Sequence, residues 1–166
     1  MKTRLLIIIG CIGIIAVGFY LNFEYYQSTI HPLNLANNNL NDIVTSSEHT
    51  VISTHLFEIK QNLMLVMEKL PEDKNPVWMF PTETTNFLRI EDDVNRMITM
   101  TKKISTVPKD SSVYYTGILE IDQSSLYIQE NIADAKGFLY ASATNVFFTL
   151  VWLLGVTGLT EVWIRK

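Results

Sequence analysis

Two pairs of methionines are the residues of this sequence best suited to chemistry. Met64 and Met67 form one Met-x-x-Met pair, and Met97 and Met100 form a second. Thioether sulfur is a soft ligand that suits Cu(I), so these four side chains are candidate copper ligands. Methionine also fills apolar cores. Met97 falls on an apolar stripe and Met67 beside it, which favours packing over metal binding and leaves copper as an alternative hypothesis.

Other catalytic arrangements do not occur in the sequence. None of the three histidines, His31, His49 and His55, has a glutamate three residues before it, as a di-iron bundle requires. No Gly-x-Ser-x-Gly elbow provides a nucleophile. Gly117 is the only glycine between residues 22 and 136, so no glycine-rich phosphate loop exists there. We expect a non-catalytic protein without a resident cofactor.

Two apolar runs bracket the rest of the chain. Residues 5–21 have no charged side chain over 17 positions, and residues 137–160 have none over 24. Because about 20 apolar residues span a bilayer, each run is a candidate transmembrane helix. Ala16-Val17-Gly18 also fits a signal-peptide cleavage site. We expect the first run to remain uncleaved, so that the chain has two membrane anchors.

Basic residues orient the two anchors. They flank each apolar run on the side towards the chain end, so the positive-inside rule places residues 1–4 and 161–166 in the cytoplasm. Residues 22–136 are then extracytoplasmic, with 9 Lys and Arg against 16 Asp and Glu. A nucleic-acid partner requires a basic surface, so this balance argues against one. We expect a two-pass protein of the cell membrane.

The extracytoplasmic segment has the periodicity of amphipathic helices. Its apolar residues recur at steps of three and four, forming stripes over residues 52–70, 87–104 and 114–135. This pattern predicts an all-α bundle with N-caps at Thr82 and Ser111. Four helices of similar length would run up, down, up and down between the anchors, at roughly 22–44, 48–70, 82–106 and 111–136. If the Asn-rich residues 31–50 are irregular, three helices with a long climbing loop are the alternative.

The stretch NPVWMFP, residues 75–81, must be a connection because its two prolines stop a helix. It nevertheless holds Val77, Trp78, Met79 and Phe80. Large apolar side chains in a connection suit the lipid headgroup layer or a protein partner. A loop that folds back over its own bundle is the alternative. We expect these four residues to form an interface.

The second anchor carries two signs of helix association. Gly137-x-x-x-Ala141 is a small-xxx-small pattern, and Gly10, Gly13 and Ala16 line one side of the first anchor. Asn145 is costly when it faces lipid and usually bonds to another helix. We therefore expect the anchors to pack on each other and on further integral-membrane subunits.

Two resemblances follow from this layout. The order of anchor, helical outer bundle and anchor resembles the ligand-binding half of chemoreceptors and sensor kinases. Those receptors continue into a cytoplasmic signalling helix, whereas this sequence stops at TEVWIRK. The start, MKTRLLIIIGCIGIIAVGF, resembles anchors common in ammonia-oxidising archaea, and the layout is similar to small extra subunits of archaeal ammonia monooxygenase. That resemblance implies structural support for a copper membrane oxygenase and carries over no catalytic residue.

The leading hypothesis is a non-catalytic accessory subunit of a larger integral-membrane complex. It would dock through both anchors and the NPVWMFP loop, with the lipid bilayer and other membrane subunits as its partners. A sensor module that binds a small ligand in its bundle is one alternative, and a copper-handling membrane protein is the other.

Overall fold

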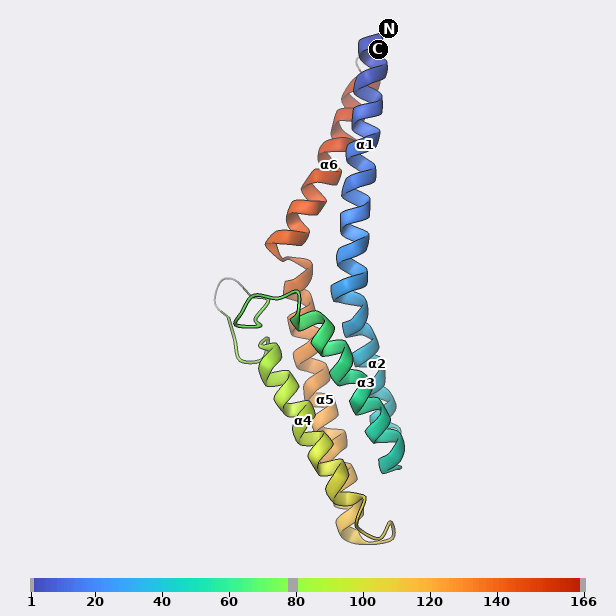
Figure 1. Ribbon diagram of the computed structural model, residues 1–166, viewed down its shortest axis with the longest axis vertical. Helices are drawn as coiled ribbons and strands as arrows, with labels where there is room; N and C mark the ends of the chain where they lie inside the picture. Colours follow the sequence, from blue (N-terminus) through green and yellow to red (C-terminus); the bar gives the residue numbers. More distant parts are fainter. Residues whose placement is uncertain (1, 78–80, 165–166) are drawn as a thin grey trace. The chain divides into compact units, whose positions relative to one another are not determined.

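A computed structural model of the chain, which describes residues 2–77 and 81–164, is built from helices (Figure 1). No strand occurs among these residues, which confirms the all-α class predicted from the apolar spacing. In chain order the elements are α1 (Lys2–Tyr25), the π-helix η1 (Tyr26–Ile30), α2 (His31–Val44), α3 (His49–Met67), α4 (Phe87–Ile104), α5 (Ser112–Tyr140) and α6 (Ala143–Ile164).

The chain divides into two compact units. One unit consists of Met1–Gln27 with Tyr140–Lys166, and the other is Ser28–Leu139. The first unit contains α1 packed on α6, and the second contains the helical bundle of α2, α3, α4 and α5.

The Asn-rich segment is helical. It forms α2, in which Leu33, Ala36, Leu40 and Ile43 repeat at steps of three and four and are each fully buried. The asparagines lie between these positions, and Asn34, Asn39 and Asn41 bond to neighbouring helices. Within residues 31–50, only residues 45–48 are not helical. Pro32 is the second residue of α2, where a missing N–H costs no helical bond.

The predicted apolar stripes form the core of the bundle. Each helix of the bundle contributes side chains with no exposed surface, among them Leu40, Leu56, Ile90 and Ile121. Burying one such side chain contributes roughly 1.5–3 kcal/mol. The stripes predicted in what are now α3, α4 and α5 are confirmed, because the helical period brings every third or fourth residue to the same face.

Two hydrogen bonds with matching spacing join α2 to α5. Lys136 Nζ donates to Asn34 Oδ1 at 3.1 Å, and Gln129 Nε2 donates to Asn41 Oδ1 at 2.8 Å. The partners are seven residues apart on both helices, which is two helical turns. These bonds give Asn34 and Asn41 of α2 partners at the seam with α5.

The helix starts agree in part with the sequence. Ser111 Oγ accepts the backbone N–H of Tyr114 at 3.2 Å, which confirms Ser111 as the cap of α5. Thr82 is not the cap of α4, contrary to the prediction. That helix begins at Phe87, and the side chain of Asn86 caps it by accepting a backbone N–H at 2.9 Å. Thr82 instead bonds within the preceding loop.

The second apolar run is not a single helix. The sequence predicted one helix over residues 137–160, but α5 continues to Tyr140 and α6 begins at Ala143. Ser142 lies at the break, and its Oγ accepts the backbone N–H of Asn145 at 3.2 Å. Neither proline nor glycine marks this break in the sequence, so the apolar pattern gave no sign of it.

Among the residues that the structure describes, two helices are long and apolar enough to cross a membrane, judged by length and composition. They are Arg4–Val44, which includes α1, η1 and α2, and Ala143–Ile164, which is α6. Only 6% of the most apolar window of each is buried inside the chain. The core helix of a soluble protein would instead be mostly buried.

Candidate functional site

Glycines allow α1 and α6 to approach closely. A Cβ placed on Gly18 would lie 2.7 Å from the backbone nitrogen of Trp152, and one on Gly155 would lie 2.9 Å from the backbone nitrogen of Ile15. Side chains do not fit at such distances, so each glycine makes room for the backbone of the opposite helix. This contact is therefore specific, in that it depends on two particular residues.

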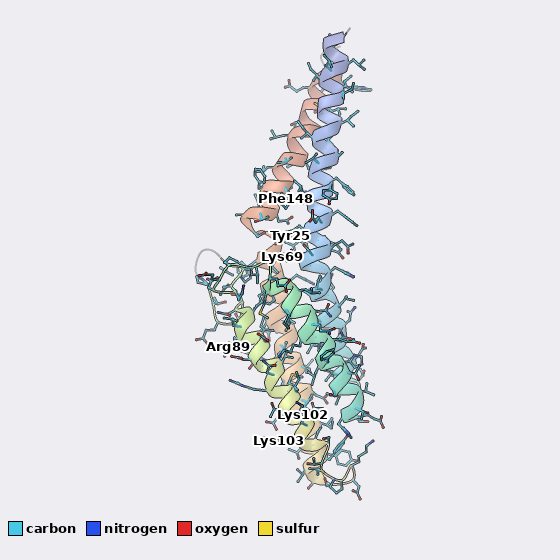
Figure 2. The ribbon with its side chains drawn as sticks, viewed as in Figure 1. Tyr25, Lys69, Arg89, Lys102, Lys103 and Phe148 are labelled. Atoms are coloured by element: carbon cyan, nitrogen blue, oxygen red, sulfur yellow. The ribbon has the colours of Figure 1, made fainter. Side chains whose placement is uncertain are left out.

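Polar side chains join the same two helices. The hydroxyls of Tyr25 and Ser142 share a hydrogen bond of 3.0 Å, and Thr149 Oγ1 lies 3.3 Å from Asn22 Oδ1. The ring of Tyr25 meets the ring of Phe148 edge-on, with 6.5 Å between centroids (Figure 2). Hydrogen bonds between helices in a membrane are worth about 0.6–2 kcal/mol each. These partners could not be predicted from the sequence, because each is a common residue type without a motif.

Asn145 bonds across the helix break. Its Nδ2 donates to the backbone carbonyl of Tyr140 at 2.7 Å. That carbonyl belongs to the last turn of α5, where carbonyls have no partner within the helix. We expected Asn145 to bond to another helix of the membrane, and its partner is the end of the helix that precedes it in the chain.

The small residues singled out from the sequence are not the ones that α1 and α6 use. A Cβ on Gly10, Gly13 or Gly137 would have nothing within 4 Å, and Ala141 is exposed. The sequence shows which residues are small, but the rotation of each helix about its axis decides which of them faces a neighbour. These positions leave open surface on the described part of the chain.

A buried asparagine organises the base of the loop between α3 and α4. Asn75 is 6% exposed, and its Oδ1 accepts from the backbone N–H of Val77 and from the hydroxyl of Thr85, both at 3.0 Å. Its Nδ2 donates to the carbonyl of Thr82 at 3.1 Å. The side chain of Asn75 thus bonds to loop segments on both sides of residues 78–80.

The predicted loop interface is described only at its edge. Val77 is 7% exposed, so its side chain packs within the chain and leaves little surface for a partner. Trp78, Met79 and Phe80 lie outside the described residues. The docking role of these three side chains stays a prediction.

The four methionines have different surroundings. Met97 is 1% exposed and Met67 is 8% exposed, as expected of core residues. Met64 is 48% exposed on α3, and Met100 lines a surface groove between α4 and α5. Two of the four thioethers are therefore buried among apolar side chains, whereas two face outward.

The pairing of α3 with α4 also separates the two methionine pairs. Lys60 Nζ donates to Asn95 Oδ1 at 2.8 Å, which places these residues at the same level of two helices that run in opposite directions (Figure 1). Met67 is seven residues beyond Lys60, about 10 Å along α3 at 1.5 Å per residue. Met97 lies beyond Asn95 in the other direction. The two methionine pairs thus lie on opposite sides of the contact between Lys60 and Asn95, and copper binding stays an untested alternative.

The histidines of α3 bond to neighbouring helices. Nδ1 of His55 lies 3.0 Å from Oδ1 of Asn39, and Nδ1 of His49 lies 3.5 Å from the hydroxyl of Tyr114. Among the described residues no group of three or more His, Cys, Asp or Glu could hold a metal ion.

Burial in the bundle perturbs the carboxyl group of Asp122 on α5. Its Oδ1 is buried and has no hydrogen-bond partner in the described part of the chain. Burial raises the pKa of Asp122 above its ordinary value of 3.8, because the charged form loses hydration. The bundle therefore favours the neutral carboxyl.

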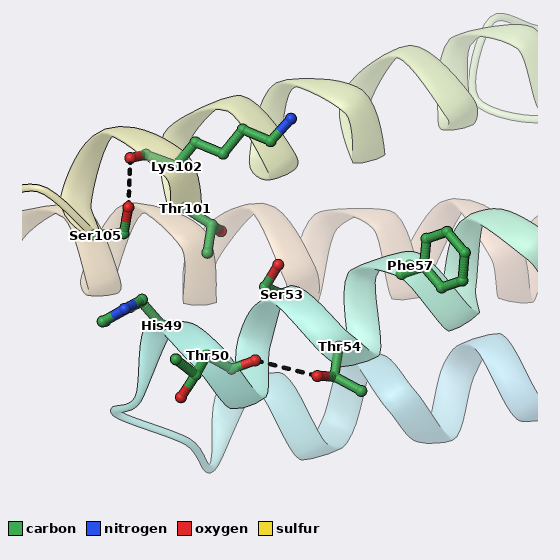
Figure 3. A pocket seen from close by; sticks show the side chains of 8 residues that line it. All are labelled: His49, Thr50, Ser53, Thr54, Phe57, Thr101, Lys102 and Ser105. Atoms are coloured by element: carbon green, nitrogen blue, oxygen red, sulfur yellow. Dashed lines mark hydrogen bonds between the residues drawn. The ribbon is translucent and has the colours of Figure 1, made fainter.

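A surface groove of about 510 Å³ lies between α3 and α4 (Figure 3). We call it the α3–α4 groove. It is rich in hydroxyl groups, with His49 at one end and Phe57 at the other, and Lys102 lies on its α4 side.

The chain was compared with protein-family models, curated proteins and solved structures, and none of them matches it.

Proposed function

We propose that this protein is a non-catalytic accessory subunit of a larger integral-membrane complex. The observation that carries the proposal is the specific contact between α1 and α6. A Cβ placed on Gly18 or Gly155 would lie less than 3 Å from backbone atoms of the opposite helix. A hydrogen bond between Tyr25 and Ser142 also joins the two helices near one end. Helices that served only to tether a soluble domain would need neither feature.

The proposed arrangement places both chain ends in the cytoplasm. Residues 22–136, with a formal charge of −7, then lie outside the membrane, in agreement with the positive-inside rule. In this arrangement α2, α3, α4 and α5 run up, down, up and down. The opposed directions of α3 and α4 and the bonded seam of α2 with α5 support this order.

The proposed docking surface is the small-residue face that α1 leaves open. Gly10 and Gly13 have nothing near a Cβ position, so the backbone of a further helix could approach them. Trp78 and Phe80 would add contacts outside the membrane. We propose a copper-dependent membrane oxygenase as the host complex, on the resemblance of the first anchor alone.

The test compares complex formation by the wild type and by Trp78→Ala and Asn145→Leu. Each variant is expressed in the native host and extracted in mild detergent, and the proteins that co-purify with it are quantified. The proposal expects less co-purification with either variant. Thr144→Leu, at an exposed position next to Asn145, is the matched control and should co-purify like the wild type. An intact complex in both test variants would contradict the proposal.

A further inference from the structure

The α3–α4 groove differs in charge from the domain that contains it. Residues 22–136 carry 16 acidic and 9 basic side chains. The described residues that line the groove nevertheless include Lys102 and His49 and no carboxylate. The acidic residue next to His49, Glu48, is paired with Lys109, with 3.2 Å between Oε1 and Nζ. The α3–α4 groove is thus a locally basic surface on an acidic domain.

Hydroxyl groups supply most of the polar lining. Ser53 on α3 and Thr101 on α4 face one another across the groove (Figure 3). The hydroxyl of Thr101 donates to the carbonyl of Met97 at 2.8 Å. The side-chain hydroxyls of Ser53 and Thr50 have no hydrogen-bond partner in the part of the chain that the structure describes, although the backbone carbonyl of Thr50 accepts from the hydroxyl of Thr54 at 3.2 Å. Their two hydroxyls can therefore donate to a ligand.

We propose that the α3–α4 groove binds a small oxyanion, such as phosphate, sulfate or a carboxylate. Lys102 supplies the positive charge, and Ser53 and Thr50 supply hydroxyl donors. Oxyanions accept short, charge-assisted hydrogen bonds from such groups. Lys102 runs along α4 at the edge of the groove (Figure 3), and its four-carbon stem lets the ammonium turn towards a bound anion. Phe57 offers an apolar edge to the organic body of a carboxylate.

The neighbouring lysine provides a matched control. Lys102 and Lys103 are consecutive, both are exposed, and both lie in the last turn of α4. Lys103 lines a different groove, between α4 and α5. Replacing either by Gln removes the same charge from the same helix end, so any general effect of charge on anion affinity is equal in the two variants.

The test titrates the full chain in detergent with inorganic phosphate, sulfate and acetate by calorimetry at constant ionic strength. We expect saturable binding of at least one anion. Lys102→Gln should weaken it about fivefold, the equivalent of roughly 1 kcal/mol, while Lys103→Gln should leave it unchanged. Ser53→Ala should weaken it less. Absence of saturable binding by the wild type, or equal weakening in both lysine variants, would overturn the proposal. The thermal midpoint of each variant verifies that it is folded.

Discussion

The side-chain amide of Asn145 donates to the backbone carbonyl of Tyr140 at 2.7 Å, across the break between α5 and α6. A polar residue in an apolar run thus satisfies a carbonyl that the end of a helix leaves without a partner. This bond explains how the chain interrupts a helix in a segment otherwise apolar enough to cross a membrane.

Replacing Asn145 by Leu should destabilise the junction between α5 and α6. The Tyr140 carbonyl would lose its partner, at a cost of about 1–2 kcal/mol. We expect a lower thermal midpoint of unfolding in detergent. Unfolding is measured by the circular dichroism signal of helices at 222 nm. Thr144→Leu changes a neighbouring exposed residue and should leave the midpoint unchanged. Equal midpoints for Asn145→Leu and the wild type would show that the carbonyl finds another partner.

Substitutions at two glycines of α1 should differ in their effect on stability. Gly18→Leu would drive a side chain into the backbone of Trp152, and overpacking of this kind costs about 1–3 kcal/mol or more. Gly10→Leu has open space and should leave the purified chain as stable as the wild type. Thermal unfolding of both variants in detergent measures this difference. If Gly10→Leu destabilised the chain as much as Gly18→Leu, the α1 and α6 contact described here would be wrong.

Removing the side chain of Asn75 should open the base of the loop between α3 and α4. Asn75→Ala leaves the Val77 N–H and the Thr82 carbonyl without their partner, and each buried unsatisfied group costs about 1–3 kcal/mol. We expect faster hydrogen exchange at the Val77 amide and faster tryptic cleavage after Lys74. Asn62→Ala is the control, because that side chain bonds only to the Glu58 carbonyl of its own helix. An unchanged hydrogen-exchange rate at Val77 in Asn75→Ala would argue against this role of Asn75.

The raised pKa of Asp122 predicts that replacing it by Asn increases folding stability by an amount that depends on pH. Because the folded-state pKa lies above the unfolded value of 3.8, ionisation costs stability as pH rises from about that value through the folded pKa. Asp122→Asn removes this cost and should be more stable than the wild type at pH 7. The difference should vanish at pH values below 3.8. Urea unfolding across this range measures it, and an advantage that persists in acid would point to a cause other than ionisation.

The sequence predicted the parts of the fold that depend on helical periodicity. The stripes that contain Leu56, Ile90 and Ile121 are buried as expected, because a 3.6-residue period alone brings their apolar residues to one face. The cap at Ser111 was also predicted, since serine preceding an apolar stripe is a strong local signal. These features require no knowledge of how the elements pack.

Features that depend on packing were not predictable in the same way. Gly18, Gly155 and Asn22 meet the opposite helix, but nothing in their local sequence distinguishes them from Gly10 or Gly13. The break before Ala143 has neither proline nor glycine beside it. The role of Asn75 depends on Thr82 and Thr85, which come near it only when the loop closes.

The most direct test of the accessory-subunit account is extraction from native membranes in mild detergent, followed by native gel separation and mass spectrometry. We expect the protein to migrate in a large assembly of fixed composition with other membrane subunits. We further expect Gly10→Leu to reduce that assembly, although the same variant leaves the purified chain stable. Migration of the wild type alone, or as a simple dimer, would contradict the account.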